Sequence, residues 1–153
     1  MPTSIKYHFV QRFRVPADRA FEWCTDYDPG DPNLMHEPGK RQIEKLARHA
    51  LLLTDTFTNG KIKTKKTKLV WLQPELLSWT NTQVVGPVKY SQFLYKITPD
   101  GENKSRLDFY GLQLEPRDMT PKEARDLARK IRAEDSLAWK YLAKAMEEEL
   151  GVV

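Results

Sequence analysis

The sequence predicts an α+β domain in which a curved antiparallel sheet wraps around one long C-terminal helix. Short segments of strand character follow one another over residues 41–116, with turn residues between them. Strands joined by such short connections pair in antiparallel order, because a parallel pair needs a long crossover. One amphipathic segment of about 30 residues comes last. We expect residues 1–153 to form a single domain, since this length is ordinary for one hydrophobic core.

The first predicted strand covers residues 5–15, and a short helix follows it. Apolar and polar side chains alternate from Ile5 to Phe9, and a period of two indicates a strand with one buried face. Pro16 fixes a backbone angle that suits the first turn of a helix. Residues 17–27 then carry apolar side chains at helical spacing, until two prolines and a glycine end the pattern.

Turn residues divide residues 41–116 into further strands. Asn59-Gly60 joins two of them and is a strong signal for a tight hairpin. Proline, glycine and asparagine mark most of the other breaks, whereas the one near His49 has no turn residue. With the N-terminal strand, the predicted strands make seven in all. The six further strands are about 41–49, 50–58, 61–72, 76–85, 89–98 and 104–115.

The long C-terminal helix is predicted from Pro121 to about Leu150. Thr120 and Glu123 have the spacing of a capping box, with proline at the first helical position. Gly151 suits the C-terminal cap. At about 100° per residue the apolar side chains form one stripe that is rich in alanine, so a sheet can approach it closely. The stripe is Ala124, Leu127, Ala128, Ile131, Ala138, Leu142, Ala145 and Met146.

Composition narrows the class of protein. Cys24 is the only cysteine, which excludes an internal disulfide and a thiolate metal cluster. No apolar run approaches the roughly 20 residues that span a bilayer, and the N-terminus has no apolar stretch of signal-peptide length, so we expect a cytoplasmic protein. The net charge of +4 is spread along the chain, which is weak evidence for nucleic acid or an anionic surface.

The order of these elements resembles that of the START and pollen-allergen-like superfamily, also called SRPBCC. The resemblance spans nearly the whole chain, although the loop tryptophan common in the family is replaced by Asn33-Leu-Met-His36. It rests on residues 15–23 (VPADRAFEW), 26–32 (DYDPGDP), 68–80 (KLVWLQPELLSWT), 92–101 (QFLYKITPDG) and 105–109 (SRLDF).

The resemblance implies the helix-grip fold, with a cavity between helix and sheet that binds lipids, sterols, quinones, polyketides or other apolar molecules. Members of the superfamily include lipid carriers, polyketide cyclases, aromatic-ring dioxygenase subunits and co-chaperones. The fold therefore does not by itself choose the function.

Several side chains are candidates for the wall of such a cavity. If the strand parities hold, five aromatic side chains point towards the helix, where Ile131 and Ala138 would face them. Aromatic walls with a few polar tips suit an apolar ligand of moderate size. The alternative is that the same side chains fill a solid core. The five aromatic residues are Trp71, Trp79, Phe93, Tyr95 and Phe109.

Asp135 is the most specific candidate for a functional residue in this cavity. It lies within about 40° of the centre of the apolar stripe, between Ile131 and Ala138. A carboxylate removed from water there is costly unless it has a partner. In the functional interpretation, Asp135 is a polar anchor or an acid/base group inside the cavity. In the alternative, it lies at the edge of the stripe and is hydrogen-bonded or in contact with water.

Five lysines crowd one predicted strand and its hairpin. Lys61, Lys63 and Lys65 share one parity, and a bulge near residues 65–66 would place Lys66 and Lys68 on the same outer face. Such a row could make transient contact with an anionic membrane surface or an acidic protein. The alternative is a solvated face that protects a strand edge. No aromatic side chains are interleaved for base stacking, so no nucleic-acid partner is expected.

Metal binding and nucleophilic catalysis find little support. The acidic segment lacks the ligand spacing of a calcium loop, and no paired-histidine motif exists. The three histidines stand far apart, and Cys24 reads as a small core residue. Gly111 reads as a bend in the last strand. We therefore predict no metal, no cofactor and no assigned catalytic residue. The acidic segment contains Asp26, Asp28, Asp31, His36 and Glu37, and the remaining histidines are His8 and His49.

The sequence thus favours a non-enzymatic carrier or sensor that holds a lipid, an isoprenoid or quinone, or a polyketide-like molecule. One alternative is an enzyme of the polyketide cyclase or dehydratase kind, in which Asp135 or Tyr95 moves a proton. Another is an interaction module, similar to the co-chaperone members, that uses the lysine strand on a protein partner.

Overall fold

The computed structural model describes residues 1–27 and 39–152, and within them it has the predicted helix-grip architecture. The described strands form one antiparallel sheet of seven, in the order β1-β7-β6-β5-β4-β3-β2. The elements are β1 (Thr3–Phe13), α1 (Ala17–Thr25), β2 (Gly39–Ala47), β3 (Ala50–Asn59), β4 (Ile62–Gln73), the 3-10 turn η1 (Pro74–Leu76), β5 (Ser78–Val85), β6 (Gln92–Pro99), β7 (Ser105–Glu115) and α3 (Pro121–Glu149).

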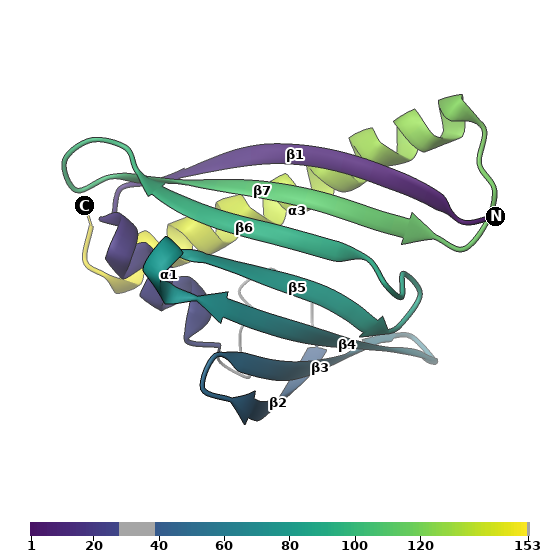
Figure 1. The fold of residues 1–153 in the computed structure, drawn as a ribbon, viewed down its shortest axis with the longest axis horizontal. Helices are drawn as coiled ribbons and strands as arrows, with labels where there is room; N and C mark the ends of the chain where they lie inside the picture. The colour runs from purple at the N-terminus through teal and green to yellow at the C-terminus, as the bar shows by residue number, and fades with distance from the viewer. Residues whose placement is uncertain (28–38, 153) are drawn as a thin grey trace.

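Figure 1 shows how the sheet and the long helix are arranged. Helix α3 begins near the start of β1 and runs diagonally behind the sheet, and it ends beside α1 near the C-terminus. The side chains of β1 alternate between buried and exposed, as the period of two predicts. The face of the sheet that meets α3 is called the inner face below, and the opposite face is the outer face. Among the described residues, no helix is long and apolar enough to cross a bilayer.

Two strands begin later than predicted because turns take their first residues. Residues 74–76 form η1, and Leu77 then has a left-handed φ of 48°, so β5 starts at Ser78. Tyr90 has a φ of 74° in the turn before β6, which starts at Gln92. Both turns use non-glycine residues in a backbone conformation that sequence patterns rarely signal.

The capping box of α3 is present as predicted. The Thr120 hydroxyl accepts a hydrogen bond from the Glu123 backbone N–H, and the Glu123 carboxylate accepts one from the Thr120 N–H, each at 3.1 Å. We expect Thr120→Ala to lower the free energy of unfolding by about 1 kcal/mol. Thr120→Ser keeps the hydroxyl and should lose less than half of that. Urea denaturation measures both, and equal losses would contradict this role of the hydroxyl.

The predicted row of five lysines on one outer face is wrong. The pairing of β3 with β4 runs without a shift from Asn59 to Ala50, so no bulge turns the strand near residues 65–66. Lys66 and Lys68 consequently point to the inner face, where they pair in register with inner-face residues of β3. The other three lysines, Lys61, Lys63 and Lys65, are exposed. Contact of these three with an anionic surface stays a prediction.

Candidate functional site

A cavity lies between the inner face of the sheet and α3. It has two chambers, a larger one of about 200 Å³ and a smaller one of about 110 Å³. Asp135 and Ala138 of α3 line only the larger chamber, whereas Leu142, one turn further along, lines only the smaller. The two chambers are adjacent and share part of their wall. The shared residues are Lys68, Asn81, Tyr95 and Trp139.

Aromatic rings form much of the wall. Trp79 stacks on Tyr95 at 4.8 Å between ring centroids, and Phe109 meets the Tyr95 ring edge-on at 5.0 Å. Phe93 lies beside Phe109 at 5.8 Å. These four aromatic residues therefore point inward, as the strand parities predicted.

The fifth predicted aromatic residue, Trp71, is on the other face. Its side chain is 54% exposed, and it pairs with Thr80, whereas Leu72 pairs with Trp79. The predicted inward orientation is wrong because Val70 and Leu72 pack into the core on the inner face, and successive side chains of a strand point to opposite faces.

The two predicted helix residues have different surroundings. Ala138 lines the larger chamber, where its small side chain leaves room between the helix and the sheet. Ile131 is buried in an apolar cluster with residues of β1, β6 and β7. It packs in the same cluster as Phe93 and Phe109 of the wall, and it does not line either chamber.

Asp135 is in the cavity wall, hydrogen-bonded to a tyrosine that the sequence did not single out. The Tyr7 hydroxyl donates to Asp135 Oδ2 at 2.5 Å. Burial first, and then the neighbouring Asp135 carboxylate, raise the pKa of Tyr7 well above its ordinary value. Tyr7 therefore stays protonated at neutral pH and remains a donor. Both side chains line the larger chamber, and the Tyr7 oxygen can still accept a hydrogen bond from a ligand there.

Gly111 makes room for this arrangement. It pairs directly with Tyr7 across β1 and β7, and a Cβ at this position would lie 2.5 Å from a ring carbon of Tyr7. The Tyr7 ring thus lies over the bare backbone of Gly111, and its hydroxyl reaches α3. The sequence interpretation of Gly111 as a bend missed this close approach, although a glycine inside a strand can also mark a site where another group comes close.

A buried ionic cluster occupies the opposite side of the cavity. Arg41 donates two hydrogen bonds to the Asp55 carboxylate, at 2.7 and 2.9 Å, and Lys68 Nζ lies 3.4 Å from the same carboxylate. The side chains of Arg41, Asp55 and Lys68 are 4%, 1% and 19% exposed. The sequence carried a signal for Asp55, since it follows Leu51 and Leu53 on the inner parity of β3.

This cluster shifts the pKa values of its members. Burial alone would raise the pKa of the Asp55 carboxyl, but the hydrogen bonds from Arg41 and the charge of Lys68 together hold it below its ordinary value. Burial is also the largest cause at Lys68, where it lowers the pKa of the ammonium against the opposing attraction of Asp55. Tyr95 is outside this cluster: burial and then the charge of Asp135 raise its pKa, against a hydrogen bond with the Asn81 side chain that lowers it.

Two polar side chains of β5 are less well satisfied. Asn81 and Gln83 are 7% and 6% exposed, and both line the larger chamber. Asn81 Oδ1 and Gln83 Oε1 have no hydrogen-bond donor in the described part of the chain. We call these two oxygens the orphan acceptors. Sequence reasoning missed them, although both residues have the inner parity of β5.

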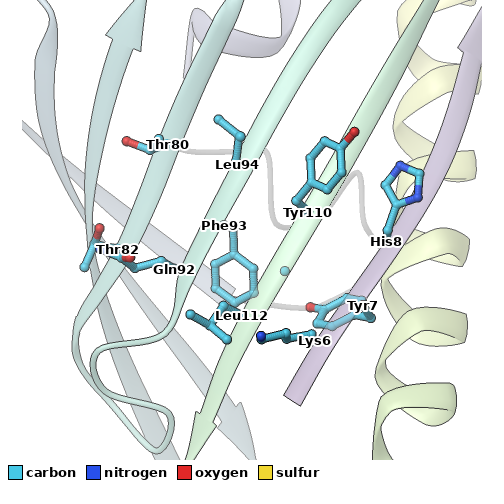
Figure 2. Close-up of a pocket in the computed structure, with 11 residues that line it drawn as sticks. Lys6, Tyr7, His8, Thr80, Thr82, Gln92, Phe93, Leu94, Tyr110 and Leu112 are labelled. Carbon is cyan, nitrogen blue, oxygen red and sulfur yellow. The ribbon is translucent and has the colours of Figure 1, made fainter. Parts of the chain in front are cut away.

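A second hollow lies on the outer face of the sheet. This outer groove has a volume of about 620 Å³ and is larger than the cavity. Figure 2 shows its lining, with His8 and Tyr110 on neighbouring strands. Their rings stack at 4.6 Å, and His8 Nε2 lies 3.1 Å from Asp108. Half-exposed side chains such as Leu94 line it, whereas the buried charges and the orphan acceptors belong to the interior cavity.

The acidic segment considered above as a possible metal site lies mostly outside the described residues. The residues that lie outside are Asp28, Asp31, His36 and Glu37. Within residues 1–27 and 39–152, no group of three or more histidine, cysteine, aspartate or glutamate side chains is arranged to hold a metal ion. Cys24 lines the smaller chamber beside Trp23.

Comparison with known proteins supports the fold. No family model matches the sequence, and no curated protein matches it. Among solved structures, the aromatase/cyclase ZhuI from Streptomyces sp. R1128 is 13% identical, with a TM-score of 0.79 over 99% of this chain and 100% of that one. The protein Ara h 8.0201 is 12% identical, with a TM-score of 0.75 over 95% and 99%.

Norcoclaurine synthase from Thalictrum flavum, solved in complex with dopamine and hydroxybenzaldehyde, is 16% identical, with a TM-score of 0.68 over 96% of this chain and 88% of that one. At such low identities the likeness establishes the fold alone. It confirms the helix-grip fold expected from the resemblance to the START and SRPBCC superfamily.

Proposed function

With this helix-grip fold as the premise, we propose that the protein binds a small aromatic or other flat apolar molecule in the cavity between the sheet and α3. One observation carries the proposal: a single cavity brings a wall of packed aromatic rings together with buried polar groups. A purely structural core gains nothing from buried charges and unpaired amide oxygens, because each must be stripped of water. A ligand site gains orientation and specificity from a few such groups.

The size of the cavity limits the ligand. A water molecule occupies about 30 Å³ in the liquid, so the larger chamber of about 200 Å³ holds the volume of roughly six or seven waters. That suits a system of one or two rings, with the smaller chamber available for a substituent such as a phenyl ring. A polyketide-like or other ring compound therefore fits this cavity better than a long-chain lipid or a sterol.

The comparisons support the same class of guest. The norcoclaurine synthase structure contains dopamine and hydroxybenzaldehyde, both of which are single-ring aromatic compounds. The aromatase/cyclase is named for chemistry that forms aromatic rings. Similarity of fold alone cannot transfer these activities to this chain, and the size and aromatic wall of the cavity are the independent argument.

A second candidate function is catalysis in the same cavity. Lys68 has a lowered pKa and lies where the two chambers meet, and the Tyr7–Asp135 pair lies in the wall of the larger chamber. Groups of this kind can move protons to and from a carbonyl compound. Chemical change of a bound compound on incubation would favour this candidate over simple binding.

The position of the site can be tested by filling it. We expect Ala138→Phe to weaken binding of the fluorescent probe N-phenyl-1-naphthylamine at least tenfold, because the new ring occupies the larger chamber. Ala133→Phe makes the same change at an exposed position of α3 and should leave binding unaltered. Fluorescence titration measures both affinities.

A third variant separates the cavity from the outer groove. Leu94→Lys places a charge in the groove and not in the cavity. If this change abolishes probe binding while Ala138→Phe leaves it intact, the probe binds outside the sheet and the proposed site is wrong.

A further inference from the structure

The cavity offers hydrogen-bond acceptors that the described protein does not use. Asn81 Oδ1 and Gln83 Oε1 are both buried, and neither has a donor among the described residues. Native proteins seldom leave buried acceptors unpaired without a functional reason. Since both side chains line the larger chamber, a ligand in that chamber can supply the missing hydrogen-bond donor.

Lys68 lies next to these acceptors. Strand pairing places it directly opposite Gln83, and Asn81 is two residues along β5 on the same face. All three residues line the larger chamber. The Lys68 ammonium has three N–H donors, and the ion pair with Asp55, at 3.4 Å, leaves it able to donate to a guest as well.

The charge on this side of the chamber restricts the donor that fits. Lys66 and Lys68 both line it, so an ammonium group on the ligand would be repelled there. The carboxylate of Asp135 is in α3 and already accepts a hydrogen bond from Tyr7. The missing donor beside Asn81 and Gln83 is therefore better supplied by an uncharged group.

We propose that the ligand is a hydroxyl-bearing aromatic compound, of the phenol or naphthol type, whose hydroxyl donates to an orphan acceptor and accepts from Lys68. A hydroxyl is the small neutral group that can donate and accept at once. Its ring then lies along the aromatic wall formed by Tyr95 and Phe109. This inference rests on the proposed function and names the chemical class of its ligand.

Other polar groups satisfy only part of this arrangement. An ether oxygen accepts from Lys68 but leaves both orphan acceptors unpaired. A carboxylate also accepts from Lys68, and it places its negative charge beside the two amide oxygens. A hydrocarbon of the same shape makes neither hydrogen bond. The two-ring series 2-naphthol, 2-methoxynaphthalene, 2-naphthoate and naphthalene separates these cases at nearly constant shape.

Competition against N-phenyl-1-naphthylamine gives the affinity of each compound at neutral pH. We expect 2-naphthol to bind about tenfold more tightly than 2-methoxynaphthalene, the ratio that one additional well-formed hydrogen bond provides. Whichever of Asn81→Leu and Gln83→Leu removes the acceptor that the hydroxyl uses should reduce this ratio. Thr80→Val removes a polar group from the outer face of the same strand and should leave the ratio unchanged.

The outcomes separate this inference from the function on which it rests. If neither the probe nor any of the naphthalene compounds binds, the proposed function fails. If the probe binds in the cavity and 2-naphthol does not displace it, the hydroxyl assignment is overturned. If naphthalene or 2-methoxynaphthalene binds as tightly as 2-naphthol, the proposed binding of an apolar ring compound is supported and the hydroxyl assignment is overturned. Tighter binding of 2-naphthoate would overturn it in favour of an anion. These comparisons use the unaltered protein, so they hold even where a variant fails to fold.

Discussion

Replacing Asp55 by asparagine should destabilise the protein by about 3–5 kcal/mol, the range found when one partner of a buried ion pair is removed. Asparagine has nearly the same shape, so packing changes little. The loss comes from Arg41 and Lys68, which then keep buried positive charges without their shared carboxylate. Urea denaturation at neutral pH measures the change in the free energy of unfolding.

Two further variants make this prediction specific. Asp100→Asn removes a carboxylate that pairs with Arg12 on the surface, and exposed pairs contribute about 1 kcal/mol or less. Adding Lys68→Met to Asp55→Asn removes one of the stranded charges and should recover part of the stability. If the two losses simply add, the charges are not coupled and this account of the cluster is wrong.

The same cluster gives the dependence of stability on pH. The pKa of Asp55 is lower in the folded protein than its ordinary value of 3.8. Its contribution is therefore fully present above that value and disappears as the pH falls through the lower, folded pKa. The difference in stability between the wild type and Asp55→Asn should shrink over this acidic range.

Replacing Gly111 by alanine should also have a large effect, of about 1–3 kcal/mol, typical of a methyl group forced into a packed interior. The new Cβ would lie 2.5 Å from the Tyr7 ring. The ring must move, and its hydroxyl then leaves Asp135. We expect weaker binding of the naphthyl probe together with lower stability, because Tyr7 and Asp135 line the larger chamber.

A double-mutant cycle separates this mechanism from a general intolerance of alanine in β7. Tyr7→Ala removes the ring that Gly111→Ala would displace, so in that background the glycine substitution should cost much less. An equal cost with and without the Tyr7 ring would show that Gly111 serves the backbone of the sheet and not the placement of Tyr7.

Local patterns were sufficient to predict most of the fold. The capping box at Thr120 and the apolar stripe that follows it placed α3 within a residue of its observed ends. Alternation of apolar and polar residues located the strands, and Asn59-Gly60 placed one hairpin correctly. These features depend on neighbours in the sequence, so a single chain contains the information for them.

The site was harder to predict because it depends on register and on distant contacts. Trp71 lies in an apolar run without alternation, so its face was not visible locally, and the inward orientation of Lys68 follows from the uninterrupted pairing of β3 with β4. The Tyr7–Asp135 hydrogen bond joins residues 128 positions apart. Asp55 shares a parity with buried leucines, and this was one signal that local reasoning could have used.

The central claim is that a ring compound occupies the cavity between the sheet and α3. Nuclear Overhauser effects between bound 2-naphthol and methyl-labelled protein test it most directly, since they arise only between neighbouring protons. We predict contacts from the naphthyl protons to the methyl group of Ala138 in the larger chamber. Contacts to the methyl groups of Leu94 and Leu112 instead would place the compound in the outer groove and contradict the account.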